Sequence, residues 1–213
     1  MPRRSRYHHG DLVAQLVRVA TDFVDRDGHE ALSVRELARS LGVSPGAPFR
    51  HFRDRDDLLR AVAHEARLRL AALAHEAIEA AADDDPLTRF RAIGFAQVRF
   101  AIRHPNLQRL AQLPTMRAPP STATEAELAT IRSMGSGARS LVVEAQARGS
   151  MRAGDPAVLA LAGVALVHGL TQLFLDGDLP REGAEQLADS VIEVLGSGFA
   201  RDASAQAASR PTR

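Results

Sequence analysis

The fold is decided by one short stretch, residues 33–52, which reads SVRELARSLGVSPGAPFRHF. Ser33 and Glu36 have the spacing of a capping box, in which each side chain hydrogen-bonds a free amide of the first helical turn. Gly42 is expected to end this helix, because glycine adopts the left-handed conformation of a tight turn at little cost. A serine–proline pair after the turn is typical of the start of another helix. The stretch therefore predicts two short helices that meet at a glycine.

Apolar residues at helical spacing extend this pair on both sides. They predict a helix over residues 11–26 and a long helix that begins after Asp54. The second helix of the glycine-hinged pair ends near Phe52, so three helices come together before the long one begins. We expect residues 1–55 to form a three-helix bundle with a helix-turn-helix and a basic N-terminal arm.

The rest of the chain carries the same helical signal. Alternation of apolar and polar residues is nearly absent and aromatic residues make up only 4%, so we expect an all-α protein of about nine helices. Residues 56–200 are expected to form a larger helical domain, and the small, polar residues 201–213 a disordered tail. Within this larger domain, further helices are expected over residues 87–103, 107–113, 124–148, 156–175 and 181–199.

Composition narrows the classes of protein. The 213 residues include no cysteine, which excludes disulfides, a thiol nucleophile and cysteine-based metal sites. The net charge of +1 gives no global attraction to nucleic acid, so any DNA binding must come from local charge. We see no run of about 18 consecutive apolar residues and no secretory signal, and we therefore expect a cytoplasmic protein that contacts no membrane.

Nothing in the sequence suggests an enzyme. His8 and His9 are adjacent in a basic arm and make a poor metal site, and residues 75–79, HEAIE, lack the second histidine of the zinc-protease helix. There is no glycine-rich phosphate loop and no G-x-S-x-G turn. We expect no catalytic residue, no metal and no cofactor.

Charge near the glycine-hinged pair favours DNA. The N-terminal end of its second helix would face base edges in the major groove. Arginines of the N-terminal arm would enter the minor groove or neutralise phosphates. Four more arginines surround the pair: Arg50, Arg53, Arg55 and Arg60. The alternative is a solvated charged face, since two helices joined at a glycine occur in many all-α folds and three aspartates dilute the cluster.

These residues also carry a resemblance. Residues 37–59, LARSLGVSPGAPFRHFRDRDDLL, resemble the DNA-binding domain of TetR-family regulators. Residues 7–12, YHHGDL, resemble the opening of one branch of that family. Residues 165–170, ALVHGL, are similar to the tryptophan-His-Gly motif of that branch, with Val167 in place of the tryptophan.

The resemblance implies a homodimer that binds double-stranded operator DNA in successive major grooves and leaves it when a small molecule binds. It implies that Ser33, Arg35 and Arg55 contact phosphates and that His51 contacts the DNA backbone. It also implies that a phosphate hydrogen bond is missing at Phe49, which stands where a tyrosine is usual. We further infer apolar contacts of Ala47 and Pro48 with thymine methyl groups. The full set of expected DNA contacts is Arg3, Arg4, Arg6, Ser33, Arg35, Ser44, Pro45, Gly46, Ala47, Phe49, Arg50, His51 and Arg55.

Residues 87–175 are expected to enclose an apolar pocket, because their helices have more apolar faces than one packed layer needs. Its candidate lining residues are Phe95, Val98, Ile102, Leu110, Leu113, Met116, His168 and Gln172. The last two helices are expected to form the dimer interface, where small residues permit close approach.

These expectations describe a repressor released from its operator by a small apolar molecule. The alternative is a helical ligand-binding or scaffolding protein without specific DNA binding. The sequence identifies neither the ligand nor the operator.

Overall fold

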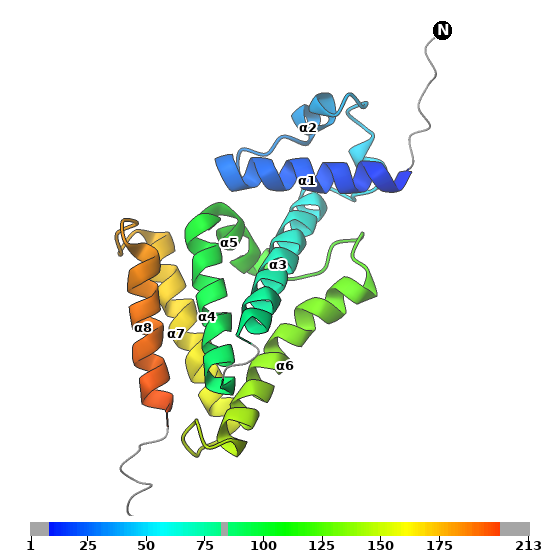
Figure 1. Cartoon of the computed structure of the whole chain (residues 1–213). Coiled ribbons are helices and arrows are strands. Elements are labelled where there is room, and N and C mark those ends of the chain that lie inside the picture. Colours follow the sequence, from blue (N-terminus) through cyan, green and yellow to red (C-terminus); the bar gives the residue numbers. More distant parts are fainter. Residues whose placement is uncertain (1–8, 82–84, 201–213) are drawn as a thin grey trace, which may run out of the picture. The chain divides into compact units, whose positions relative to one another are not determined.

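The computed structural model describes residues 9–81 and 85–200, and within these ranges it is built of helices and has no strand. This confirms the all-α prediction. There are eight α-helices and two short 3-10 helices in the described part (Figure 1). In chain order they are α1 His9–Asp27, α2 Val34–Ser40, η1 Pro48–Arg50, α3 Arg55–Ala80, α4 Pro86–Arg103, α5 Pro105–Gln112, η2 Pro114–Met116, α6 Glu125–Ala147, α7 Pro156–Asp176 and α8 Ala184–Phe199.

The chain packs as two units. The first holds residues up to 69 together with residues 104–129, and the second holds residues 70–103 and those from 130 on. The border between the units falls inside two helices, α3 and α6. The functional boundary expected after residue 55 stays a prediction, since packing divides the chain elsewhere.

The caps expected in the first unit are present. The Oγ of Ser33 accepts a hydrogen bond from the amide of Glu36 at 3.4 Å and begins α2. Asp54 accepts from the amide of Asp57 at 2.6 Å and so begins α3. Gly42 has a φ of +67°, the left-handed conformation that lets the chain turn after α2. These contacts place the helix-turn-helix where the sequence predicts it.

Residues 104–129 belong to the first unit through specific contacts. His104 Nδ1 lies 2.7 Å from the carboxylate of Asp25 in α1. The guanidinium of Arg67, in α3, donates to the carbonyls of Ala111 and Met116 at 2.7 and 2.8 Å. Arg67 is partly buried and loses water there, which lowers its pKa. Residues that lie 44 and 49 positions after Arg67 in sequence thus help to complete the unit.

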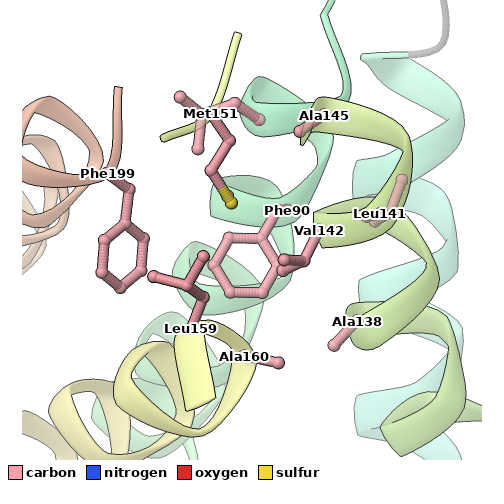
Figure 2. Packing of buried hydrophobic residues seen from close by; sticks show 10 residues of the cluster. Phe90, Ala138, Leu141, Val142, Ala145, Met151, Leu159, Ala160 and Phe199 are labelled. Carbon is pink, nitrogen blue, oxygen red and sulfur yellow. The ribbon is translucent and has the colours of Figure 1, made fainter. Parts of the chain in front are cut away.

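The second unit has α4 packed against α7 and α8 (Figure 1). Figure 2 shows one of its cores, where Phe90 lies among side chains from α6 and α7 and near Phe199. A Cβ built at Gly163 would lie 2.6 Å from Cζ of Phe90, so only glycine lets α7 come this close to α4. Arginine–carboxylate pairs such as Arg99 with Asp189, at 3.0 Å, join α4 to α8.

Helix α7 is unusually apolar. Of the helices in the described ranges, it is the one long and apolar enough to cross a membrane by length and composition, with a mean hydropathy of 2.0. Only 39% of its most apolar stretch is buried within the chain. The sequence did not single it out as a candidate span, because His168, Thr171 and Gln172 interrupt its apolar run. Its exposed apolar side chains form a surface that the described part of the chain leaves uncovered.

Candidate nucleic-acid interface

The segment after Gly42 is not a regular α-helix. The amide of Ala47 donates to the carbonyl of Ser44 at 2.9 Å, and a 3-10 helix, η1, follows from Pro48 to Arg50. Proline has no N–H, so the hydrogen bond that would join these turns into one α-helix cannot form. The prediction of a short α-helix ending near Phe52 is therefore wrong in type: the recognition segment is a series of tight turns.

The turns present a small, mostly apolar edge to solvent. Ser44, Pro45 and Gly46 are exposed, and the Phe49 side chain is 52% exposed. Pro48 is buried instead, so the expected contact of Pro48 with thymine methyl groups is wrong. Phe49 is the large apolar group that this edge offers. Ala47 is half-buried beside it.

Three exposed arginines lie on α2 and η1, the elements on either side of the turn at Gly42. Arg35 and Arg39 are four residues apart on α2, so they share one face, and both are exposed. Arg50 is exposed at the end of η1. None of the three is paired with a carboxylate in the part of the chain that the structure describes. Sequence reasoning missed Arg39, although its spacing from Arg35 gives the signal.

Other arginines of the predicted cluster are occupied. The Arg55 guanidinium donates to the carbonyls of His29 and Leu32 at 2.5 and 3.1 Å, and so holds the loop after α1. Arg53 is bound to Asp57 at 3.1 Å, and Arg60 lies 3.3 Å from the same carboxylate. An Arg55→Ala variant, expected from the sequence to flatten the salt dependence of binding by about one unit, would also release this loop. Removal of Arg55 therefore tests more than a phosphate contact.

The remaining expected contacts are distributed as follows. Ser33 is half-buried and its hydroxyl serves as the cap of α2. His51 is half-buried, and its carbonyl accepts from the hydroxyl of Ser121 at 3.4 Å. Arg3, Arg4 and Arg6 lie outside the described residues, as do residues 7–8 of the proposed branch motif and the tail after residue 200.

Asp57 fixes the base of this interface. Its side chain is fully buried and accepts hydrogen bonds from the side chain and amide of Arg53. It also accepts from the amide and hydroxyl of Ser121, at 3.1 and 2.6 Å. Burial opposes ionisation, but these hydrogen bonds outweigh it and hold the pKa of Asp57 well below its usual range. The recognition turns and the loop before α6 are thus fastened to one carboxylate.

The expected ligand-lining residues do not form one group. Val98 is buried in a core cluster with Leu170 and Phe174, and Phe95 and Ile102 pack against that cluster. The remaining five residues lie apart from it or at the surface. Leu110 and Met116 are buried in the first unit, Leu113 and Gln172 are half-buried, and His168 is exposed.

The second unit instead has a cavity of about 250 Å³ between α3, α4 and α6, called here the α6 cavity. Its walls are mostly apolar, with one imidazole and two hydroxyl groups among them. The lining residues are Ala71, Ala74, His75, Ile78, Ile93, Thr130, Ser133, Met134 and Gly137.

Comparison with known proteins identifies the family to which this chain belongs. Residues 16–62 match the model of bacterial regulatory proteins of the tetR family, and residues 90–195 match the tetracyclin repressor-like C-terminal domain. The chain belongs to the TetR family. TetR-family proteins are DNA-binding transcriptional regulators, so the chain is a regulator and not an enzyme. The branch suggested by residues 7–12 stays a prediction.

One curated protein and two solved structures illustrate the similarity. An HTH-type transcriptional repressor of Mycobacterium tuberculosis, Rv1474c, is 38% identical over 74 residues, a match that covers 35% of this chain and 40% of the repressor. A protein of unknown function from Rhodococcus sp. RHA1 is 32% identical, with a TM-score of 0.73, and the match covers 93% of this chain and all of that one. A putative TetR-family regulator from Rhodococcus sp. shares the fold at 23% identity and a TM-score of 0.64, over 87% of this chain and 99% of its own.

Proposed function

We propose that this TetR-family regulator is a cytoplasmic, dimeric repressor that binds operator DNA and is released by a small apolar molecule. The observation that carries the proposal is the edge formed by exposed residues 44–46 and Phe49, together with three exposed arginines of α2 and η1 that have no carboxylate partner among the described residues. Free guanidinium groups neutralise phosphates, and small or apolar groups between them approach bases closely.

The alternative, a helical ligand-binding or scaffolding protein without specific DNA binding, gains support from the irregular recognition segment and from Phe49. The unpaired arginines of the helix-turn-helix count against this alternative. Arg53 and Arg60 nearby are paired with Asp57, whereas Arg35, Arg39 and Arg50 are left open. A surface that served only solubility would not need to keep some arginines unpaired while others are paired with a carboxylate.

The dimer is supported by the exposed faces of α7 and α8. Large apolar side chains of α7 are strongly exposed, including Leu161 at 66% and Val158 at 60%. Leu187 and Val194 of α8 are 37% and 74% exposed and, seven residues apart, lie on one helix face. We place a second copy of the chain on this surface, because a two-fold dimer presents two recognition edges to a palindromic operator.

The α6 cavity supports the effector part of the proposal. Its apolar walls with a few polar groups are typical of small-molecule sites, and we place the effector there instead of among the eight residues expected from sequence. Gly137 lines it, and a Cβ at that position would meet no atom within 4 Å. Larger side chains at residue 137 can therefore fill the space.

Loss of two free arginines tests DNA binding. The double variant R35A/R39A is expected to bind DNA from upstream of its own gene on the order of 10-fold to 100-fold more weakly, with the salt slope reduced by about two per subunit, or about four for the dimer. Fluorescence anisotropy at several salt concentrations measures both. The control R139A/R152A removes two exposed arginines of the second unit and should bind like wild type. Equal salt slopes for the two double variants would contradict the proposed interface.

Filling the α6 cavity tests release. Gly137→Leu is expected to keep operator binding and to lose release by compounds that displace the wild-type protein, because leucine occupies the effector's space. Release is measured as loss of anisotropy in a screen of small apolar molecules. Gly135→Leu is the matched control: Gly135 is exposed, does not line the cavity and also has free space for a Cβ. Should G137L respond like G135L, the effector binds elsewhere.

A further inference from the structure

The first unit contains its own cleft, separate from the α6 cavity. It measures about 400 Å³ and lies between α1, α3 and the segment that leads into α6. We call it the His64 cleft. Aliphatic side chains form most of its walls, and four charged side chains also line it. The apolar residues are Val13, Ala14, Val17, Ala61, Leu68, Pro120 and Ala123, and the charged ones are Arg18, Glu65, Arg69 and Glu127.

His64 is one of the residues that line this cleft, and one of its ring nitrogens is unsatisfied. The residue is only 6% exposed, and its Nε2 atom is buried without a hydrogen-bond partner. The carboxylate that faces it is that of Glu127, whose oxygen lies 3.6 Å away, too far for a hydrogen bond. A buried polar atom of this kind costs free energy unless another group satisfies it.

Glu127 is already oriented by its own helix. Its Oε2 accepts from the amide of Thr124 at 2.7 Å and from the Thr124 hydroxyl at 2.9 Å, in the capping box that begins α6. The hydrogen bond from the Thr124 amide is the main reason that the pKa of Glu127 lies below its usual value. The cleft therefore holds a fixed carboxylate 3.6 Å from an imidazole nitrogen that lacks a hydrogen-bond partner.

The charges around the cleft favour a neutral ligand. Arg69 is paired with Glu65 at 2.9 Å, which leaves Arg18 and Glu127 with opposite charge. A cation would meet Arg18, and an anion would meet Glu127. A neutral hydroxyl group avoids both penalties, because it both donates and accepts a hydrogen bond.

We propose that the His64 cleft binds a small apolar molecule with one hydroxyl group, a phenol or an alcohol. Nε2–H of His64 donates to the hydroxyl oxygen, and the hydroxyl donates to the carboxylate of Glu127. The apolar body lies against Val13, Val17 and Leu68. Such a molecule joins α3 to the first turn of α6 and gives the DNA-binding unit a ligand site of its own, beyond the effector site proposed above.

A matched pair of probes tests this site. 4-Propylphenol and its methyl ether, 4-propylanisole, have the same apolar body, but the ether has no hydroxyl proton to donate. Isothermal titration is expected to show that the phenol binds the full-length protein at least about 10-fold more tightly than the ether. The imidazole NMR signal of His64, assigned as the one missing from His64→Leu, should move with the phenol.

Three variants locate the binding. His64→Leu should bind the two probes equally, and Ala61→Leu, which fills the cleft from a buried position, should bind neither. His75→Leu, in the α6 cavity, should behave like wild type. Thermal unfolding by circular dichroism confirms that each variant is folded.

Several outcomes would overturn the proposal. Equal binding of phenol and ether by the wild-type protein, or no binding of the phenol at all, would mean that the cleft holds only water. Binding that survives Ala61→Leu but is lost in His75→Leu would place the probe in the α6 cavity. That last result would leave the proposed repressor function intact, whereas a failure of the operator experiments would not affect the His64 cleft.

Discussion

Replacement of Asp57 by alanine is expected to lower the free energy of unfolding by about 3 kcal/mol at neutral pH, because several donors lose a buried charged acceptor and each buried donor left unsatisfied costs about 1–3 kcal/mol. The variant would leave the Arg53 amide and the Ser121 amide and hydroxyl without the acceptor that the buried carboxylate supplies. It would also free the recognition turns from the loop before α6. Urea unfolding followed by circular dichroism measures the loss, and operator binding should fall with it.

The Asp57 carboxylate also makes the stability of the folded protein depend on pH in acid. Because the pKa of Asp57 is lower in the folded protein than in the unfolded chain, its contribution is present above the unfolded pKa, near 4, and is lost as the pH falls below it. The wild-type protein should lose stability in acid, and Asp57→Asn should make the profile flatter. Asp56→Asn is the control, because Asp56 is exposed in the same helical turn. Identical profiles for the two variants would contradict the role of Asp57.

Charged side chains on the exposed apolar residues of α7 and α8 are expected to convert the proposed dimer into monomers. The double variant L161E/V194E places two carboxylates per subunit on side chains that are 66% and 74% exposed in the single chain. In the dimer these carboxylates would be buried without partners, which costs several kcal/mol for each charge. Operator affinity should fall about 100-fold or more, because the two half-sites are no longer bound by one linked molecule.

Light scattering after size exclusion measures the mass directly. Val143→Glu is the control, since Val143 is a similarly exposed apolar residue, at 49%, but lies on α6. The control should remain dimeric and bind DNA normally. A double variant that stays dimeric would place the subunit contact elsewhere and leave the apolar surface of α7 without an explanation.

Local signals in the sequence predicted much of this fold. The cap at Ser33 and the turn at Gly42 appear in the structure because each depends only on residues within a few positions. Pro48 lacks the N–H that a regular helix needs, but the sequence alone did not show that the recognition segment would become a series of tight turns. Short-range signals therefore predicted where the motif lies in the sequence but not the conformation of its recognition segment.

Long-range contacts were not accessible in the same way. The carbonyls that Arg55 binds lie 23 to 26 residues earlier in the chain, and the Ser121 that binds Asp57 lies 64 residues later. Helical periodicity shows that a face is apolar but not which helix covers it. For that reason the eight residues expected around one ligand were divided between a solid core, the first unit and the surface.

Because residues 104–129 pack with the N-terminal helices, the DNA-binding part of this protein is not a contiguous segment of the gene. A chain truncated after residue 69 would lack Ser121 and Glu127 and should express poorly as an isolated domain. A chimera that exchanged effector domains at that point would inherit the same defect, because its Asp57 would face a foreign loop. Successful exchange of specificity in this regulator would require two crossover points, with the intervening 104–129 segment kept from the parent that supplies the DNA-reading end.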